Sequence, residues 1–477
     1  MTPTRAGGFD QKIAIIGAGP AGLSCAFYLA EKGYKPVVFE KNERPGGMLT
    51  YGIPSFKLQK DVIEAEVEVI RLMGAEFRYG VEVGRDVTLD ELRAQGFKAF
   101  YVAIGCQGGR LAGIPGEDAE DVTVAVDFLR EVNSGKIDAL PGRTIVVGGG
   151  NVAIDVARNA CRLGSEHVEM FCLESEAQMP ASEEERREAI EDGVHISCGW
   201  AKEVHLDEAG HVRGITFKRC TRVFDDEGRF APEYDENDLR RVDADRVVMS
   251  IGQSIVWGDL LAGSKVELGR GQGALADPQT YQTAEPDIFV GGDVYTGPSF
   301  AIDAIAAGHE AAVSIHRFVQ PGSTLTIGRN QRRYTALDRD DVVIESYDNA
   351  SREVAHVDRE REKAAPFSEY VETFTEEQVR AETARCLGCG ARSSTPTSVS
   401  AAACAPPSAR SMPSIWIAIA PSAPRWSNTS KSSPAWQVRF EACDQNQIWE
   451  EIKNATNKRT AQRTVGQRAS PRRGEVP

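Results

Sequence analysis

Residues 12–40 decide the fold: Lys12-Ile-Ala-Ile-Ile16, Gly17-Ala18-Gly19-Pro20-Ala21-Gly22, a helical run, and Pro36-Val-Val-Phe-Glu40. The order is strand, glycine turn, helix from Leu23 to Glu31 ended by Gly33, and a second strand that ends on an acid. In such a unit the first glycine permits a tight turn, the second admits a pyrophosphate and the third lets helix pack on strand. The helix N-terminus attracts the anion. We therefore expect a dinucleotide at Gly17, Gly19, Pro20, Ala21, Gly22 and Glu40, with a purely structural glycine turn as the alternative.

A second unit of the same kind begins at Arg143. The strand Arg143–Val147 leads into Gly148-Gly149-Gly150-Asn151-Val152-Ala153, a helix follows as far as Gly164, and His167–Cys172 forms the next strand. Ala153 takes the place of the third glycine, which the motif allows. Two dinucleotide units in one chain indicate one flavin and one nicotinamide cofactor that exchange a hydride. The alternative is that the second unit is a degenerate structural repeat.

The end of the second strand bears on the choice of nicotinamide cofactor. An arginine usually meets the 2′-phosphate of NADP. Here the chain reads Cys172-Leu-Glu174-Ser-Glu176, without a base. Because Glu174 would accept a hydrogen bond from a free 2′-hydroxyl and repel a 2′-phosphate, the sequence predicts NADH rather than NADPH.

Composition excludes several classes of protein. The chain has 477 residues with 55 Lys and Arg against 70 Asp and Glu, a net charge of −15, which disfavours general nucleic-acid binding. The chain has no run of about 18 apolar residues, so we expect no helix that spans a membrane. Residues 1–10 have no signal-peptide core. We therefore expect a cytoplasmic protein whose ten cysteines are thiols, ligands or redox groups.

Five later blocks carry a family resemblance. They are the segment from Glu40 through Pro45-Gly46-Gly47 to Lys57, and the blocks at residues 114–116, 179–185, 251–253 and 291–293. Together they resemble the glutamate synthase small subunit and the electron-input half of dihydropyrimidine dehydrogenase. The resemblance implies further cofactor contacts at Lys41, Gly46, Gly47, Lys57, Val83, Ile251, Gly252, Gly292, Asp293, Ser299 and Ala301. In this family Lys57 stands where an arginine is usual.

The residues around Asp293 also indicate a ligand site independently of the resemblance. Residues 287–290 read as a strand, and Gly291-Gly292 leaves room for a ligand at its end. By resemblance, Asp293 would bond the ribityl chain of FAD, although an ordinary turn aspartate is the alternative. A helix from Ile302 to Ala312 would then direct its N-terminus at the flavin.

The expected architecture is α/β, with two Rossmann-like domains of the three-layer, glutathione-reductase-like kind. Because the flavin blocks flank the nicotinamide block, the NAD(P) domain should be inserted into a discontinuous FAD domain. The expected divisions are residues 1–112 (FAD domain, first part), 113–260 (NAD(P) domain), 261–330 (FAD domain, second part), 331–390 (helical extension) and 391–477 (low-complexity tail).

The cysteine pattern argues against a dithiol flavoenzyme. Cys25, Cys106, Cys161, Cys172, Cys198 and Cys220 are isolated in sequence, and each is expected to be a buried small hydrophobe. The first pair is Cys386-Leu-Gly-Cys389, after a helix capped by Thr375 and Gln378. The family uses a comparable pair as iron–sulfur ligands. A 4Fe–4S cluster needs four thiolates, and only Cys404 and Cys443 follow, so two free thiols are the alternative.

The tail has an unusual composition. In residues 392–436, 28 of the 45 residues are Ser, Pro or Ala, and none is acidic, which is typical of a disordered linker. A change of reading frame near codon 392 is the other hypothesis. Shifted by one base, Val399, Ala402, Ala405 and Ala409 can each become cysteine, with the spacing of a bacterial ferredoxin. The basic stretch 453–473 would then be out-of-frame sequence or a tail, with a nucleic-acid-binding arm as the alternative.

These features predict an FAD-dependent NAD(P)H oxidoreductase that takes a hydride from NADH to FAD. Electrons would pass to iron–sulfur centres, to a larger catalytic subunit or to a ferredoxin-like acceptor. We nominate no catalytic acid or base, because hydride transfer to flavin needs none. The alternatives are the input subunit of an NAD-dependent dihydropyrimidine dehydrogenase-type complex and a non-catalytic scaffold subunit that contains FAD.

Overall fold

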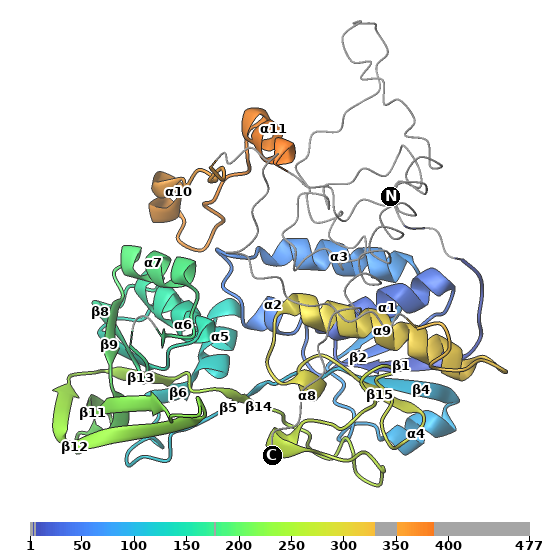
Figure 1. The fold of residues 1–477 in the computed structure, drawn as a ribbon, viewed down its shortest axis with the longest axis horizontal. Helices are drawn as coiled ribbons and strands as arrows, with labels where there is room; N and C mark the ends of the chain where they lie inside the picture. The colour runs from blue at the N-terminus through green and yellow to red at the C-terminus, as the bar shows by residue number, and fades with distance from the viewer. Residues whose placement is uncertain (1–2, 4–5, 176–177, 330–350, 386–477) are drawn as a thin grey trace, which may run out of the picture. The chain divides into compact units, whose positions relative to one another are not determined.

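Two five-stranded parallel sheets organise the computed structural model, which describes residue 3 and residues 6–175, 178–329 and 351–385 (Figure 1). The first sheet has the order β15-β4-β1-β2-β3 and the second β6-β13-β7-β8-β9. The strands of the first sheet are β1 (Lys12–Ile16), β2 (Val37–Glu40), β3 (Glu76–Tyr79), β4 (Phe97–Val102) and β15 (Ile288–Val290). Those of the second are β6 (Val122–Val124), β7 (Arg143–Val147), β8 (His167–Cys172), β9 (His195–Cys198) and β13 (Arg246–Met249).

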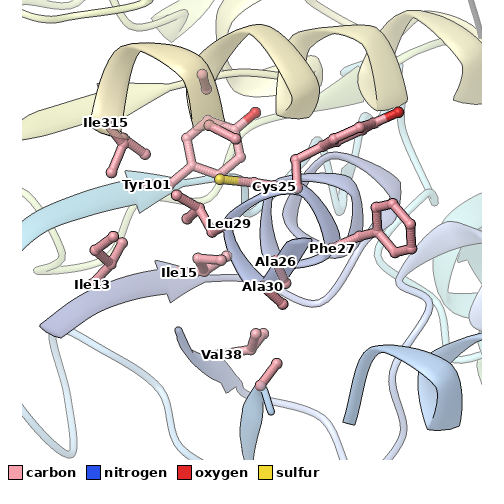
Figure 2. Close-up of a cluster of buried hydrophobic side chains, with 14 of the residues drawn as sticks. Ile13, Ile15, Cys25, Ala26, Phe27, Leu29, Ala30, Val38, Tyr101 and Ile315 are labelled. Atoms are coloured by element: carbon pink, nitrogen blue, oxygen red, sulfur yellow. The ribbon is translucent and has the colours of Figure 1, made fainter. Parts of the chain in front are cut away.

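The first sheet is covered on both faces, so its strands other than the edge strand β3 are almost continuously apolar. Three helices, α1, α3 and α9, lie along one face (Figure 1). Figure 2 shows Ile13 and Ile15 of β1 packed there with Leu29 of α1 and Ile315 of α9. The helices around this sheet are α1 (Pro20–Lys32), α2 (Met48–Tyr51), α3 (Lys60–Leu72), α4 (Leu89–Ala94), α8 (Asp293–Thr296), α9 (Ala301–Val319) and the 3₁₀ turn Arg270–Gln272.

The second sheet lies between helices and a small antiparallel sheet. Helices α5 (Ala125–Asn133), α6 (Asn151–Arg162) and α7 (Glu183–Glu191) belong to this unit. The antiparallel sheet consists of β10 (Trp200–Leu206), β11 (Val212–Phe224) and β12 (Phe230–Val242). The rings of Phe171 and Phe217 stack 3.7 Å apart and join the two sheets. Parallel strands that alternate with helices confirm the expected α/β class.

Two short strands connect the sheets. β5 (Gly108–Gly109) pairs antiparallel with β14 (Gln253–Ser254), so the outgoing and returning chain segments run side by side. The second sheet is thus inserted between β4 and β15 of the first. Leu260 already packs in the core of the first sheet. The crossover therefore lies a few residues before each expected boundary, and the boundaries at residues 112 and 260 stay predictions.

The segment 351–385 contains two short helices, α10 (Arg359–Ala364) and α11 (Glu376–Ala384), joined by irregular chain. Thr375 and Gln378 form the expected capping box of α11. Tyr370 attaches the segment, because its hydroxyl accepts a hydrogen bond of 2.6 Å from the buried Arg158. Gln59, which precedes α3, donates a hydrogen bond to the carbonyl of Phe367 at 3.2 Å. None of the helices in the described residues is long and apolar enough to cross a membrane.

Candidate cofactor sites

The first glycine turn joins β1 to α1 as the sequence predicts. Gly17 has a φ of +104°, and a Cβ there would lie 2.5 Å from the carbonyl oxygen of Ala103. At Gly22 a Cβ would lie 1.9 Å from the carbonyl oxygen of Gly17, so the helix touches the turn only because Gly22 has no side chain. Around Gly19 a Cβ would meet nothing within 4 Å. The second glycine therefore faces open space, which suits the approach of a pyrophosphate.

Glu40 holds this turn in place. Its carboxylate is only 3% exposed and accepts hydrogen bonds from the backbone of Ala18 at 2.8 Å and Asn42 at 2.9 Å. The Asn42 side chain donates a third, at 2.6 Å. Gly46 donates to the carbonyl of Ala18 at 2.8 Å, so the Pro45-Gly46-Gly47 segment packs directly on the turn. The carboxylate is thus oriented by the protein before any ribose arrives.

Two clefts open at the carboxyl edge of the first sheet. The outer cleft contains the expected residues Gly17, Glu40, Lys41 and Val83. The central cleft has a volume of about 1610 Å³, part of which is open to solvent. Its lining includes the expected residues Gly17, Gly19, Pro20, Ala21, Glu40, Gly47, Asn151, Val152, Gly292, Asp293, Ser299 and Ala301. Gly22 and Gly46 are not among the lining residues of either cleft; they support the turn from behind.

Asp293 lies in the central cleft at the start of α8. Burial raises the pKa of its carboxyl, while a hydrogen bond from the backbone of Ser299 lowers it in part. That bond is 3.3 Å long and fixes the turn between α8 and α9. Helix α9 begins at Ala301, close to the expected start, but continues to Val319 rather than ending at Ala312. Its N-terminal residues line the same cleft, as expected.

Lys57 lies between the part of the chain that forms the first sheet and the part that forms the second, rather than in either cleft. Its ammonium pairs with Asp155 of α6 at 2.6 Å and with Glu185 of α7. Burial, only partly offset by Lys57, raises the pKa of Asp155 to about 6. Asp155 itself lines the central cleft. The ion pair therefore connects the segment that contains Lys57 to α6, the helix that follows the second glycine turn.

The second glycine turn has the same geometry as the first. Gly148 has a φ of +138°, and a Cβ there would lie 2.2 Å from the carbonyl oxygen of Ser250. Gly150 precedes α6 and has open space where a Cβ would stand, while the Cβ of Ala153 is buried in the core. The turn thus offers a helix N-terminus to an anion, as expected.

A third cleft, here called the nucleotide cleft, surrounds this turn. It contains every expected residue of the second site except Ala153: Gly148, Gly149, Gly150, Asn151, Val152, Glu174, Ile251 and Gly252. Among the described residues, no donor reaches the Glu174 carboxylate. Glu174 is therefore ready to accept a hydrogen bond from a ligand.

The nucleotide cleft and the central cleft are contiguous. Val126, Asn151, Val152, Gln253 and Pro298 line both. One cofactor in each cleft would therefore meet the other at these residues. Sequence reasoning missed residues 103–105, Gln107 and Asp155 in the central cleft, and Trp200 and Phe230 in the nucleotide cleft. The first could have been found, because it follows β4 at the same carboxyl edge as the glycine turn.

The six cysteines of the described residues are all free thiols. Cys25, Cys106 and Cys172 are buried as expected, and Cys161 and Cys220 are only half-buried. Cys198 is exposed, because it ends the edge strand β9. Cys106 is the thiol next to the central cleft: its sulfur donates to the carbonyl of Asp293 at 3.5 Å, and burial raises its pKa to about 12. A thiol with so high a pKa is a poor nucleophile.

No group of three or more metal-ligating side chains occurs in the described part of the chain. Cys386 and Cys389, the expected iron–sulfur ligands, lie outside the described residues, as does the whole tail from residue 391. The cluster and the change of reading frame therefore stay hypotheses.

Comparison with known proteins decides the family. Residues 11–308 match the family described as pyridine nucleotide-disulphide oxidoreductase. The chain belongs to this family. The match spans both glycine turns and the return to the first sheet. Membership confirms the expected enzyme class, an oxidoreductase that uses FAD and NAD(P)H.

Relatives agree with the resemblance seen in the sequence. The chain is 36% identical over 398 residues to the beta subunit of an NADP(+)-dependent formate dehydrogenase of Moorella thermoacetica, which covers 80% of this chain and 54% of the relative. It is 36% identical over 330 residues to the glutamate synthase [NADPH] small chain of Escherichia coli, covering 65% and 69%. The PreT subunit of the NAD-dependent dihydropyrimidine dehydrogenase of E. coli is 34% identical over 310 residues, covering 65% and 68%. The chain thus spans about half the length of the Moorella relative.

Solved structures support the fold. Mycobacterium tuberculosis FprA in complex with NADPH superposes with a TM-score of 0.54 at 19% identity, covering 65% of this chain and 84% of that one. Thioredoxin reductase of T. acidophilum gives 0.50 at 18% identity, covering 64% and 98%. These likenesses confirm the two-domain Rossmann-like architecture.

Proposed function

We propose that this chain is an electron-input module that takes a hydride from NADH to FAD and delivers electrons to iron–sulfur centres or a partner subunit. The observation that carries the proposal is the continuity of the two clefts at Asn151, Val152 and Gln253. The names of relatives that belong to glutamate synthase and to dihydropyrimidine dehydrogenase support it.

The central and outer clefts would hold FAD. The open space at Gly19 and the N-terminus of α1 suit its pyrophosphate, the preset Glu40 its ribose, and Asp293 its ribityl chain. These residues fit the cofactor. FAD, when bound, supplies a hydride acceptor that can release electrons singly. The chain itself contributes position: the Lys57–Asp155 pair holds α6 against the flavin-side segment, and Pro298 and Val126 form an apolar wall where the clefts meet.

We propose NADH as the donor. Glu174 has no partner among the described residues and lies beside Gly149, whose Cβ would stand 3.2 Å from the carboxylate. A 2′-phosphate would meet this negative charge in a partly buried cleft, where repulsion is weakly screened. The names of the relatives include both NADPH and NAD enzymes, so they leave the choice to Glu174.

The electron exit and the partner belong to the same proposal. Cys386 and Cys389 would contribute to a 4Fe–4S cluster in the intact family pattern, and a larger catalytic subunit or a ferredoxin-like protein would receive the electrons. Sequencing the gene around codon 392 tests whether a ferredoxin module was lost there: codons incompatible with the second frame would end that hypothesis. We also propose a cytoplasmic location, which the free thiols support, and the five-part domain division given above.

The test uses the purified protein with its flavin. NADH added anaerobically should bleach the flavin absorbance, and NADPH at the same concentration should do so more slowly. A flavin that stays yellow with both would instead favour the non-catalytic scaffold. Faster bleaching by NADPH would overturn the cofactor preference while leaving the oxidoreductase intact.

One alternative enzyme has a specific observation in its favour, the likeness to PreT. In that case the chain would feed a pyrimidine-reducing subunit. Co-purification separates the two: a large amidotransferase subunit supports the glutamate synthase type, and a pyrimidine-reducing subunit supports the other.

A further inference from the structure

A long hairpin extends beyond the second sheet on its cofactor side. β10 starts at Trp200, just after β9, and runs away from the carboxyl edge. Its antiparallel neighbour β11 passes Trp200 at Lys218 and continues to Phe224, where the chain turns and returns as β12 from Phe230 (Figure 1). The tip of the hairpin, residues 219–235, therefore reaches past the carboxyl edge, where parallel α/β sheets bind their ligands.

The tip lies on the Glu174 side of the nucleotide cleft. β8 and β9 pair at Cys172 and Cys198, and Glu174 and Trp200 each follow two residues later, so the hairpin starts beside Glu174. Phe230 and Trp200 line the cleft together with Leu173 and Glu174. Asn151 and Gln253 line the part of this cleft that is shared with the central cleft.

Phe230 is an unusual residue for its position. Its side chain is 62% exposed on a hairpin whose other residues are mostly charged or polar. In the described structure its only ring contact is an edge-on one with Phe224, whose centroid is 6.3 Å away. A large apolar ring that lines a cleft and is left open to water loses the free energy of burial that a ligand would restore.

The order of groups in the cleft assigns the ligand. A dinucleotide that places nicotinamide at the junction of the clefts and pyrophosphate at Gly148–Gly150 must direct its adenosine toward Glu174. We propose that Phe230, on the hairpin tip, forms an aromatic subsite that stacks on the adenine of NADH, with Glu174 on the adjoining ribose. The assignment builds on the proposed function and adds a specificity-determining residue from outside the glycine motif.

Reduced nicotinamide mononucleotide tests the subsite, because it carries the same hydride but lacks the adenylate half. The rate of anaerobic flavin bleaching is measured against the concentration of each donor in the wild type and in Phe230→Ala. Base stacking on an aromatic ring is strong enough for its loss to weaken binding roughly 10-fold or more. We expect the apparent Kd for NADH to rise by about that factor, with an unchanged limiting rate and no change for the mononucleotide.

Two further variants control the result. Leu239→Ala removes another large apolar side chain of β12 that is 46% exposed and does not line the cleft, so it should behave as wild type. Phe230→Tyr should restore NADH affinity, and Phe230→Leu should restore it only in part. Equal NADH affinity in Phe230→Ala and the wild type, or an equal loss with both donors, would overturn the subsite. A wild-type flavin that neither donor bleaches would overturn the proposed function and the subsite with it.

Discussion

The two glycine turns share a geometry but differ in what stands beside them. At the first, the acid that ends the second strand, Glu40, is buried and accepts three hydrogen bonds from Ala18 and Asn42. At the second, the corresponding acid, Glu174, has no donor among the described residues. A preset, closed site suits a cofactor that stays bound, and an open site with an unsatisfied acceptor suits one that exchanges. On the function proposed above, this difference assigns FAD to the first turn and NADH to the second.

The largest expected effect is at the third position of the turns. Gly22→Ala would place a Cβ 1.9 Å from the Gly17 carbonyl oxygen and force the helix away from the strand. We expect a loss of about 3 kcal/mol of folding free energy and loss of most of the bound FAD, measured by flavin absorbance per protein. The matched change in the second turn, Ala153→Gly, should cost only about 1 kcal/mol and retain FAD. Equal FAD loss in both variants would contradict the comparison.

Next in size is the ion pair between the two units. Lys57→Ala leaves Asp155 without its partner in a buried position, which should cost about 3 kcal/mol in urea unfolding and slow flavin reduction by NADH roughly 10-fold by displacing α6. Lys57→Arg should restore both. Reduction by dithionite, which needs no nucleotide site, serves as the control and should be unchanged.

The cost of Lys57→Ala should depend on pH. Burial raises the pKa of Asp155 to about 6 in the folded protein. The protonated carboxyl therefore stabilises the fold fully at pH values below the pKa of the unfolded chain, and this stabilisation is lost as the pH rises through about 6. The protonated carboxyl does not need Lys57, so the difference in unfolding free energy between wild type and Lys57→Ala should shrink from pH 7.5 to pH 5. A difference that is the same at both pH values would show that Asp155 is not buried as a charge.

The smallest effect concerns the ribose. Glu174→Ser removes the negative charge from the second turn without touching Glu40. The ratio of kcat/KM for NADPH to that for NADH should rise about 10-fold, since one close charge repulsion is removed in a partly screened cleft. Asp207→Ser, an acid on the turn between β10 and β11, is the control and should leave the ratio unchanged. No change in Glu174→Ser would remove the basis for an NADH preference.

Local sequence predicts much of the fold and of the two sites, but not all of it. Short patterns predict the two turns, because each glycine is required by a backbone contact within one βαβ unit. Short patterns also predict Glu40, Glu174 and the return of the chain at Asp293. The partner of Lys57 lies 98 residues away, and no local pattern names it. Phe230 reaches the nucleotide cleft because β11 continues past the start of β10, and a local pattern does not reveal this strand register. Helix α9 continues past Ala312 through long-range contacts that a local pattern does not show: Ser314 is buried, and the His316 ring hydrogen-bonds the Tyr34 hydroxyl at 2.9 Å.

The central claim is direct hydride transfer between cofactors in contiguous clefts. The most direct measurement is stopped-flow bleaching of the flavin by NADH and by NADH carrying deuterium at the transferred position of C4, under anaerobic conditions. We predict full bleaching within the instrument's range and a slower rate with deuterium, because the bond to that hydrogen breaks in the observed step. A flavin that remains oxidised under excess NADH would contradict the account.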